Sequence, residues 1–115
     1  MQMRLPGLVV LIASTCVMAA DEPFLKENEA AMTKMMAAMA VTPSGDVDKD
    51  FVATMVPHHQ GAIEMAQAEL RYGHNEQLRR MAQEIIVTQT QEIAVMRLAI
   101  GAAPGGEVPA GKVPK

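Results

Sequence analysis

The sequence predicts an all-α protein, a helical bundle built from an antiparallel helix hairpin and a methionine-rich first helix. Two observations support this prediction. Apolar residues between about 23 and 100 recur at helical spacing, and no segment shows the alternation of a strand. Proline and glycine breaks divide this region into three stretches that are rich in helix formers. With 115 residues, the chain suffices for one small domain.

Residues 1–20 have the character of a secretory signal peptide. Arg4 supplies the positive start, and the apolar run that follows it, to residue 18, is too short to span a bilayer. Ala19 and Ala20 are small residues of the kind found at a cleavage site. We therefore expect the leader to be cleaved and the mature protein to be periplasmic or secreted.

A lipoprotein anchored through Cys16 is the alternative, and Thr15 argues against it because it is unfavourable just before a lipidated cysteine. Cleavage after the leader would remove Cys16, the single cysteine. The mature chain would then have no disulfide and no thiolate ligand. No other segment is apolar enough to cross a membrane, so we expect no integral membrane segment after cleavage.

The first predicted helix extends from about Pro23 to Val41. Proline suits the first turn of a helix, and strong helix formers follow it. The stretch 42–46, with the sequence TPSGD, ends the helix. Methionines recur at positions i, i+3, i+4 and i+7 and should share one face. They are Met32, Met35, Met36 and Met39.

The second predicted helix begins at Asp46 or Asp48, either of which can cap it, and extends to about Tyr72. Gly73 should end it in the left-handed conformation. Pro57 lies inside the helix and predicts a kink, which is either merely tolerated or aims the residues that follow. The expected apolar face contains Phe51, Met55, Ala62, Ala66 and Leu70.

The third predicted helix begins after a cap at Asn75 and extends to Ile100, where Gly101 stops it. Because the link to the second helix is short, the two should form an antiparallel hairpin. The expected apolar face contains Leu78, Met81, Ala82, Ile85, Ile86, Ile93, Met96 and Ile100.

The helical domain is therefore predicted to cover residues 21–101. Residues 102–115 are dense in glycine and proline and are predicted to be a disordered tail. Three helices of this size enclose a thin core, which is compatible with a homo-oligomer.

Methionine is unusually frequent in this chain. Eleven occur in all, and eight remain once the leader is removed, with only one tyrosine and two phenylalanines. Removal of Arg4 also leaves nine basic residues against thirteen acidic ones. The mature chain has no basic patch, so we do not expect nucleic acid as a partner.

Two adjacent histidines, His58 and His59, lie on the second helix. At about 100° per residue both flank the apolar face, and Met55, His58 and Met65 follow one ridge. A methionine stripe is more often core packing than a binding site. Together with export and the lack of cysteine, however, imidazole and thioether groups indicate copper, with thioether favouring Cu(I).

Other chemistries match the sequence less well. Calcium and magnesium need oxygen-rich loops, and zinc seldom accepts methionine. A di-iron bundle needs Glu-x-x-His pairs on two helices, which the sequence lacks. No serine or cysteine is placed with a base, so we do not expect an enzyme. His74 lies in the interhelical turn and is expected to be exposed and uninvolved.

A longer pattern surrounds the histidine pair. On the second helix it comprises Phe51, Met55, Pro57, His58, His59, Ala62, Met65 and Ala66. On the third helix it comprises Gln89, Glu92, Ile93 and Met96. This pattern, over about residues 46–100, resembles the CopM-like family, first described as a domain of unknown function. Ala99 departs from it, because many members carry tryptophan there.

The resemblance implies a ferritin-like helical bundle and an exported protein that binds copper for metal handling or resistance, with a copper-handling protein as a further partner. The alternative is a small envelope interaction module in which these residues simply pack. The residues expected to bind copper as Cu(I) or Cu(II) are His58, His59, Met55, Met65, Met96, Glu92, Met32, Met35, Met36 and Met39.

Overall fold

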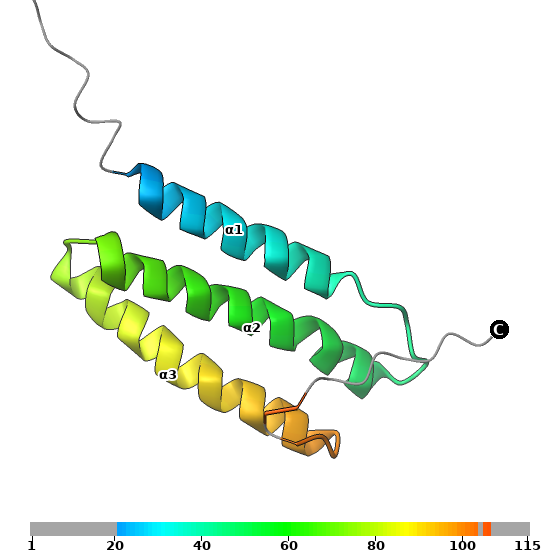
Figure 1. Cartoon of the computed structure of the whole chain (residues 1–115). Coiled ribbons are helices and arrows are strands. Elements are labelled where there is room, and N and C mark those ends of the chain that lie inside the picture. The colour runs from blue at the N-terminus through cyan, green and yellow to red at the C-terminus, as the bar shows by residue number, and fades with distance from the viewer. Residues whose placement is uncertain (1–20, 104, 107–115) are drawn as a thin grey trace, which may run out of the picture.

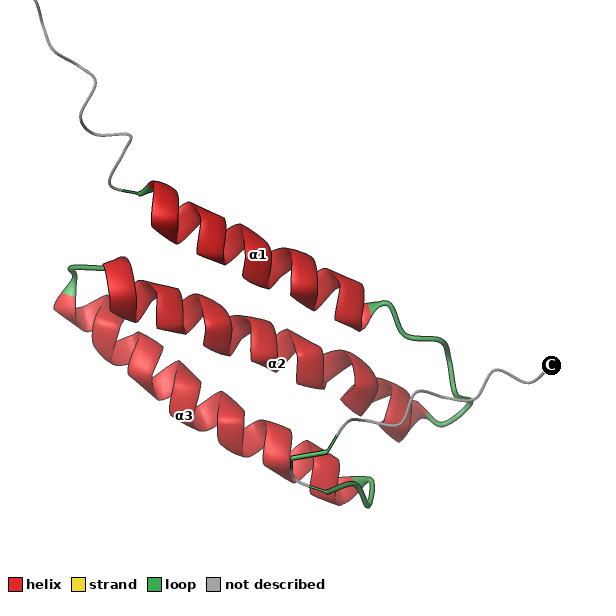
Figure 2. Cartoon of the chain, in the orientation of Figure 1, coloured by secondary structure: helices red, strands yellow, loops and turns green. Residues whose placement is uncertain are grey.

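A computed structural model describes residues 21–103, 105 and 106, and the predicted leader and most of the predicted tail lie outside this range. The described chain is all-α, as predicted, without a strand. Its helices are α1 (Glu22–Met39), α2 (Val47–Tyr72) and α3 (Glu76–Ala99), which run alternately up and down (Figures 1 and 2). Within this range, none of the helices has the length and apolar character that crossing a membrane requires.

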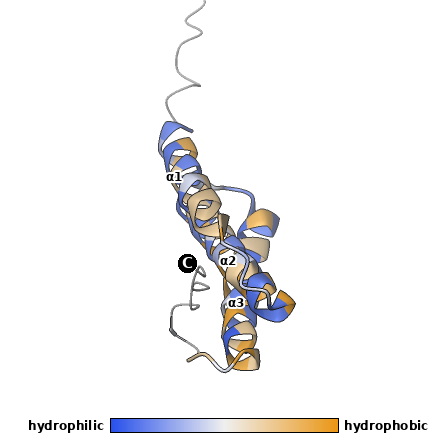
Figure 3. Ribbon diagram, turned by 90° about the vertical axis from the view of Figure 1, so that its right-hand side faces the viewer, coloured by the Kyte–Doolittle hydropathy of each residue, from blue (hydrophilic) through white to orange (hydrophobic). Residues whose placement is uncertain are grey.

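The three helices form an open bundle that is one layer thick. α2 lies in the middle, with α1 on one side and α3 on the other (Figure 1). Among the described residues, α1 and α3 do not contact each other. Seen from the side, the helices fall into one narrow band (Figure 3). α2 therefore packs on two opposite sides, and both broad faces of the layer stay open.

Local capping signals in the sequence set the helix ends. The Asp46 side chain accepts hydrogen bonds from two backbone N–H groups in the first turn of α2, which identifies it rather than Asp48 as the cap. Asn75 does the same for α3. Gly101 follows α3 with a φ of 76°, in the left-handed region that glycine adopts easily.

Gly73 is not the left-handed stop that the sequence predicted. Its φ is −74° and its ψ is 149°, an extended conformation. Its N–H still donates to the Glu69 carbonyl, at 2.8 Å. Space explains the glycine, because a Cβ at this position would lie 2.7 Å from the Glu69 carbonyl oxygen, a backbone atom that cannot move aside as the Glu69 side chain can. The link to α3 therefore depends on a close approach rather than on a positive φ.

The contact between α2 and α3 holds the main apolar core. Burying a side chain of this size contributes about 1.5–3 kcal/mol. No large side chain in the described chain is fully buried, because each helix has neighbours on only one or two sides. The buried cluster consists of Val52, Val56, Ile63 and Ile93, with Ile86, Met96 and Ile100 packed against it.

The predicted apolar faces are partly wrong. Phe51, Leu78 and Met81 are each more than half exposed, whereas Val52 and Ile63, which the prediction omitted, are buried. The reason is the single layer: α2 has a neighbour on two opposite sides, so its buried positions follow two stripes. A single apolar stripe is expected only where a helix faces one core on one side.

α1 packs closely on α2 through a glycine. Met35 is buried, and a Cβ added to Gly61 would lie 2.7 Å from its Sδ atom. Glycine inside a helix costs about 0.5–1 kcal/mol relative to alanine, and here it allows α1 to approach. Pro57 lies in the same contact, and α2 continues through it as one helix.

Polar contacts between side chains also join α1 to α2. The Glu27 carboxylate accepts hydrogen bonds from the Arg71 guanidinium and the Tyr72 hydroxyl, both at 2.8 Å. Lys34 and Glu64 form a second ion pair, at 2.6 Å. The hydrogen bonds from Arg71 and Tyr72 hold the pKa of Glu27 below its ordinary value, and the Glu27 carboxylate raises the pKa of Tyr72.

Gly61→Ala should destabilise the protein, although alanine is the better helix former. The added methyl must displace Met35, at a cost of about 1–3 kcal/mol, which exceeds the gain in helix propensity of roughly 0.5–1 kcal/mol. Thermal unfolding followed by circular dichroism measures the change. In a Met35→Ala background, which removes the Met35 Sδ and Cγ but keeps its Cβ at 2.9 Å, the same substitution should be clearly less destabilising. If Gly61→Ala destabilised the wild type and the Met35→Ala protein equally, the packing of Met35 against Gly61 could not be the cause.

Acid should weaken the attachment of α1. The ordinary pKa of Glu27 is 4.5 and its folded pKa is lower, so its contribution is complete above the ordinary value. That contribution is lost as the pH falls through the folded pKa. Glu27→Gln should therefore lower the melting temperature at about pH 7 and have much less effect at about pH 2. Glu29→Gln, on the same helix and exposed, is the control and should change neither; equal effects of Glu27→Gln at both pH values would refute the argument.

Candidate metal centre

His59 lies on the side of α2 that faces α3, and both of its ring nitrogens have partners. Nδ1 is 2.9 Å from the Met55 carbonyl oxygen, one turn earlier in α2. Nε2 is 2.8 Å from a carboxylate oxygen of Glu92 on α3. The His59 side chain is only 13% exposed. Since a carbonyl oxygen can only accept, Nδ1 donates to it, and Nε2 is the nitrogen directed at Glu92.

This geometry serves either an ion pair or a metal ligand. With both nitrogens protonated, the imidazolium of His59 donates to both acceptors and pairs with Glu92. When Nε2 is unprotonated it can bind a metal, while Nδ1 still donates to a carbonyl, which is how metal-binding histidines are usually oriented. The 2.8 Å between Nε2 and the carboxylate oxygen also suits two adjacent ligands, each about 2.0 Å from a square-planar ion.

A shallow groove between α2 and α3 surrounds this pair, with a volume of about 560 Å³. Two thioethers, from Met55 and Met96, join the imidazole and the carboxylate there. Thr88 also lines the groove and was not predicted; its position one turn before Glu92 is the signal that could have indicated it. The lining residues are Phe51, Met55, His59, Thr88, Gln91, Glu92, Val95 and Met96.

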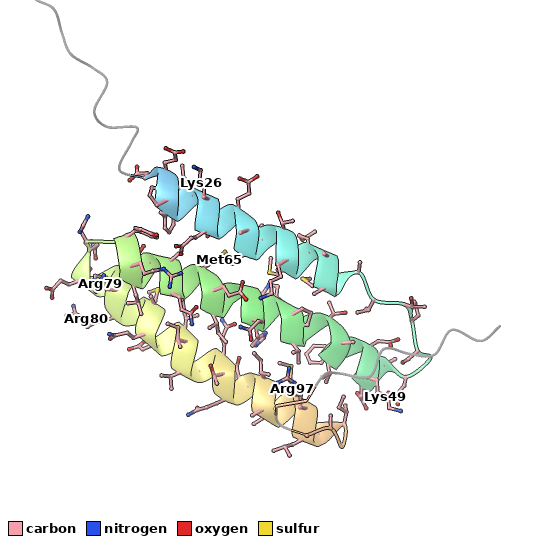
Figure 4. All side chains as sticks on the ribbon, in the orientation of Figure 1. Lys26, Lys49, Met65, Arg79, Arg80 and Arg97 are labelled. Atoms are coloured by element: carbon pink, nitrogen blue, oxygen red, sulfur yellow. The ribbon has the colours of Figure 1, made fainter. Side chains whose placement is uncertain are left out.

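His58 does not share the groove with its neighbour. Its side chain is exposed, and its ring centroid is 6.0 Å from that of His59, with the ring planes inclined by 61°. Because successive residues diverge by about 100° around a helix, His59 faces α3 and His58 faces the open side nearer α1. Met65, seven residues after His58, lies on the same side of α2, toward α1 (Figure 4).

The α1 methionines do not form one row of ligands. Met35 is buried against Gly61, whereas Met36 is 60% exposed and points outward. Met32 and Met39 lie on either side of Met35 along α1. Since α1 and α2 are antiparallel, Met39 is expected at the level of His58, and Met32 one to two turns further along α2.

The ten predicted ligands therefore fall into two groups, separated by α2, with Met35 and Met36 outside both. One group spans α2 and α3 and comprises Met55, His59, Glu92 and Met96. Helix geometry places the other group along the border of α1 and α2, where it comprises Met32, Met39, His58 and Met65. Within the described chain, no three histidine, cysteine, aspartate or glutamate residues cluster as metal ligands would. Each group instead combines one imidazole with thioethers, from Met55 and Met96 in the first and from Met32, Met39 and Met65 in the second.

Residues 14–100 match a protein family that is described as a domain of unknown function, DUF305. This match includes all three helices and most of the chain. The chain belongs to the DUF305 family. No curated protein matches this DUF305 chain. The family description carries no activity, so the function must be argued from the side chains that the fold brings together.

Proposed function

We propose that this DUF305 chain is an exported copper-binding protein that sequesters copper or hands it over, without catalysing a reaction. The observation that carries the proposal is the orientation of His59. Its Nδ1 is fixed by the Met55 carbonyl, and its Nε2 points at the Glu92 carboxylate. The thioethers of Met55 and Met96 lie in the same groove.

The donor set favours copper over the other common ions. Calcium takes six to eight oxygen ligands and magnesium demands near-octahedral oxygen geometry, whereas the groove contributes one carboxylate. Zinc binds histidine and carboxylate but seldom thioether. Nitrogen and oxygen donors suit Cu(II) and thioethers suit Cu(I), so a mixed set accommodates both oxidation states. An open groove with such ligands can hold and release an ion, which supports a handling role rather than catalysis.

The CopM-like and ferritin-like affiliation belongs to the same proposal. Helical bundles build metal sites from side chains on facing helices, and the α2–α3 pair, with His59 opposite Glu92, has this design. The leader at residues 1–20 would deliver the protein to the periplasm. Copper would then be passed to, or received from, a second copper-handling protein.

A metal-free interaction module is the second candidate function. Its support is the exposure of large apolar side chains, among them Phe51 at 56% and Met81 at 56%. Contiguous apolar surface of this kind often marks a protein–protein contact. Copper titration of His59 variants separates the two candidates, because a metal-free module should bind copper only weakly and with no dependence on His59.

His59→Ala should weaken Cu(II) binding by at least about tenfold, and Glu92→Gln should weaken it by about 10–100-fold, as loss of a ligand or of its carboxylate partner does. Competition titration of the metal-free protein measures both. The matched controls are His74→Ala, in the exposed turn, and Glu84→Gln, exposed on α3; both should bind like wild type. Wild-type affinity in folded His59→Ala and Glu92→Gln proteins would refute the proposal.

The thioether group beside α1 should contribute selectively to Cu(I) binding. Replacing Met32, Met39 and Met65 together by leucine should lower Cu(I) affinity and leave Cu(II) affinity nearly unchanged. Leucine keeps the volume, so each change should cost less than about 1.5 kcal/mol of stability. Met36→Leu, at an outward-facing position, is the control. An equal loss for Cu(I) and Cu(II), or none for either, would contradict this assignment.

A further inference from the structure

The two broad faces of the open layer differ in character. One face, which we call the methionine face, presents apolar side chains from all three helices. Its defining residues are Met32, Phe51, Met55, Met65, Leu78 and Met81. His58 is exposed among them. Apolar surface left open across three neighbouring helices is unusual for a monomer and marks a contact site.

Helix geometry places these residues on one face. Met81 lies about three turns before Glu92 on α3, so it points to the side on which the His59–Glu92 pair lies. Phe51 lies about two turns before His58 on α2 and shares its side. On α1, Lys34 is about 200° around the helix from Met32. The ion pair between Lys34 and Glu64 therefore lies on the opposite face.

Helix geometry directs most of the described lysines and arginines away from the methionine face: Lys49 is about 180° around α2 from His58, and Arg79 and Arg97 are each about 160° around α3 from Met81. In Figure 4, Lys26, Arg79 and Arg80 lie toward one end of the layer, and Lys49 and Arg97 toward the other. Most of the described cations pair with a carboxylate of their own helix or of the neighbouring helix. A lipid surface attracts clustered lysine and arginine, and this face does not provide them.

The face has the size that a stable dimer needs. α1, α2 and α3 contain 18, 26 and 24 residues. At a rise of 1.5 Å per residue and a spacing of 8–10 Å between helices, they span roughly 900 Å² of projected surface. Covering it in two copies buries on the order of 1,800 Å², which is within the range of stable protein interfaces.

We propose that a second copy of this chain covers the methionine face, so that two open layers form one six-helix body around a two-fold axis. A two-fold interface uses the same patch on both copies, so Glu92, which lies on this side and is paired with His59, would enter it together with the apolar residues. Domains are generally built from two packed layers, and each copy alone has one. The contact also brings His58 of both copies into one interface. This inference rests on exposure and shape rather than on copper binding. Because Phe51 and Met55 belong both to the methionine face and to the groove beside His59, the second copy would also cover that groove.

The test is the oligomeric state of the metal-free full chain, measured by sedimentation at increasing concentration. Wild type should be a dimer. Met81→Glu should raise the dissociation constant at least tenfold, because it puts a charge into an apolar interface. Val87→Glu is the matched control: it lies on the same helix and is 58% exposed, against 56% for Met81, but on the outer edge of the layer. It should remain a dimer.

Both substitutions are at exposed positions, and circular dichroism checks that each protein is folded. Leu78→Glu, on the methionine face and 51% exposed, provides a second variant that should also dissociate. A wild-type monomer at every concentration would overturn the proposal, as would equal dissociation by Met81→Glu and Val87→Glu. A monomer that binds phosphatidylglycerol vesicles would assign the face to a lipid surface instead. The sedimentation test uses metal-free protein and the Met81, Leu78 and Val87 variants, whereas the copper titrations use His59 and Glu92 variants, so the two proposals can fail separately.

Discussion

Both outer helices pack on α2 and neither contacts the other, and this constraint determines most of what the domain can do. α2 must bury two opposite sides, so its remaining two sides become part of the broad faces. The core is divided into two strips, one of aliphatic residues toward α3 and one around Met35 and Gly61 toward α1. The residues proposed to bind copper are divided in the same way, because each can reach only the neighbour on its own side.

Helix identity and helix ends could be predicted because they depend on local signals. Asp46 and Asn75 cap the helices that follow them through bonds to nearby backbone groups, which need no tertiary partner. The arrangement of the helices could not be predicted in the same way. An apolar stripe indicates that a helix has a neighbour, but not how many neighbours it has or on which sides they lie. On α2, Phe51 was expected in the core and is exposed, whereas the adjacent Val52 is buried. Gly73 was misjudged because its close contact with Glu69 is invisible in sequence.

The part of the candidate metal site that lies between α2 and α3 could be predicted, because the hairpin of these two helices determines it. A short link fixes the antiparallel register of α2 and α3, and His59 and Glu92 therefore meet. The α1 methionines were harder to place because Met32, Met35, Met36 and Met39 together occupy a wide arc of their helix. The contact with α2 buries Met35 in the middle of that arc and leaves Met36 outside. Sequence periodicity cannot tell which part of an arc a neighbour will cover.

The lack of contact between α1 and α3 also bears on how this chain can vary. Substitutions at sites that share no partner combine additively, whereas residues in contact are coupled. Changes around Gly61 and changes around Ile93 should therefore contribute independently to the free energy of unfolding. One half of the domain can accumulate substitutions without requiring compensation in the other. Only α2, which belongs to both halves, is restricted from two directions at once.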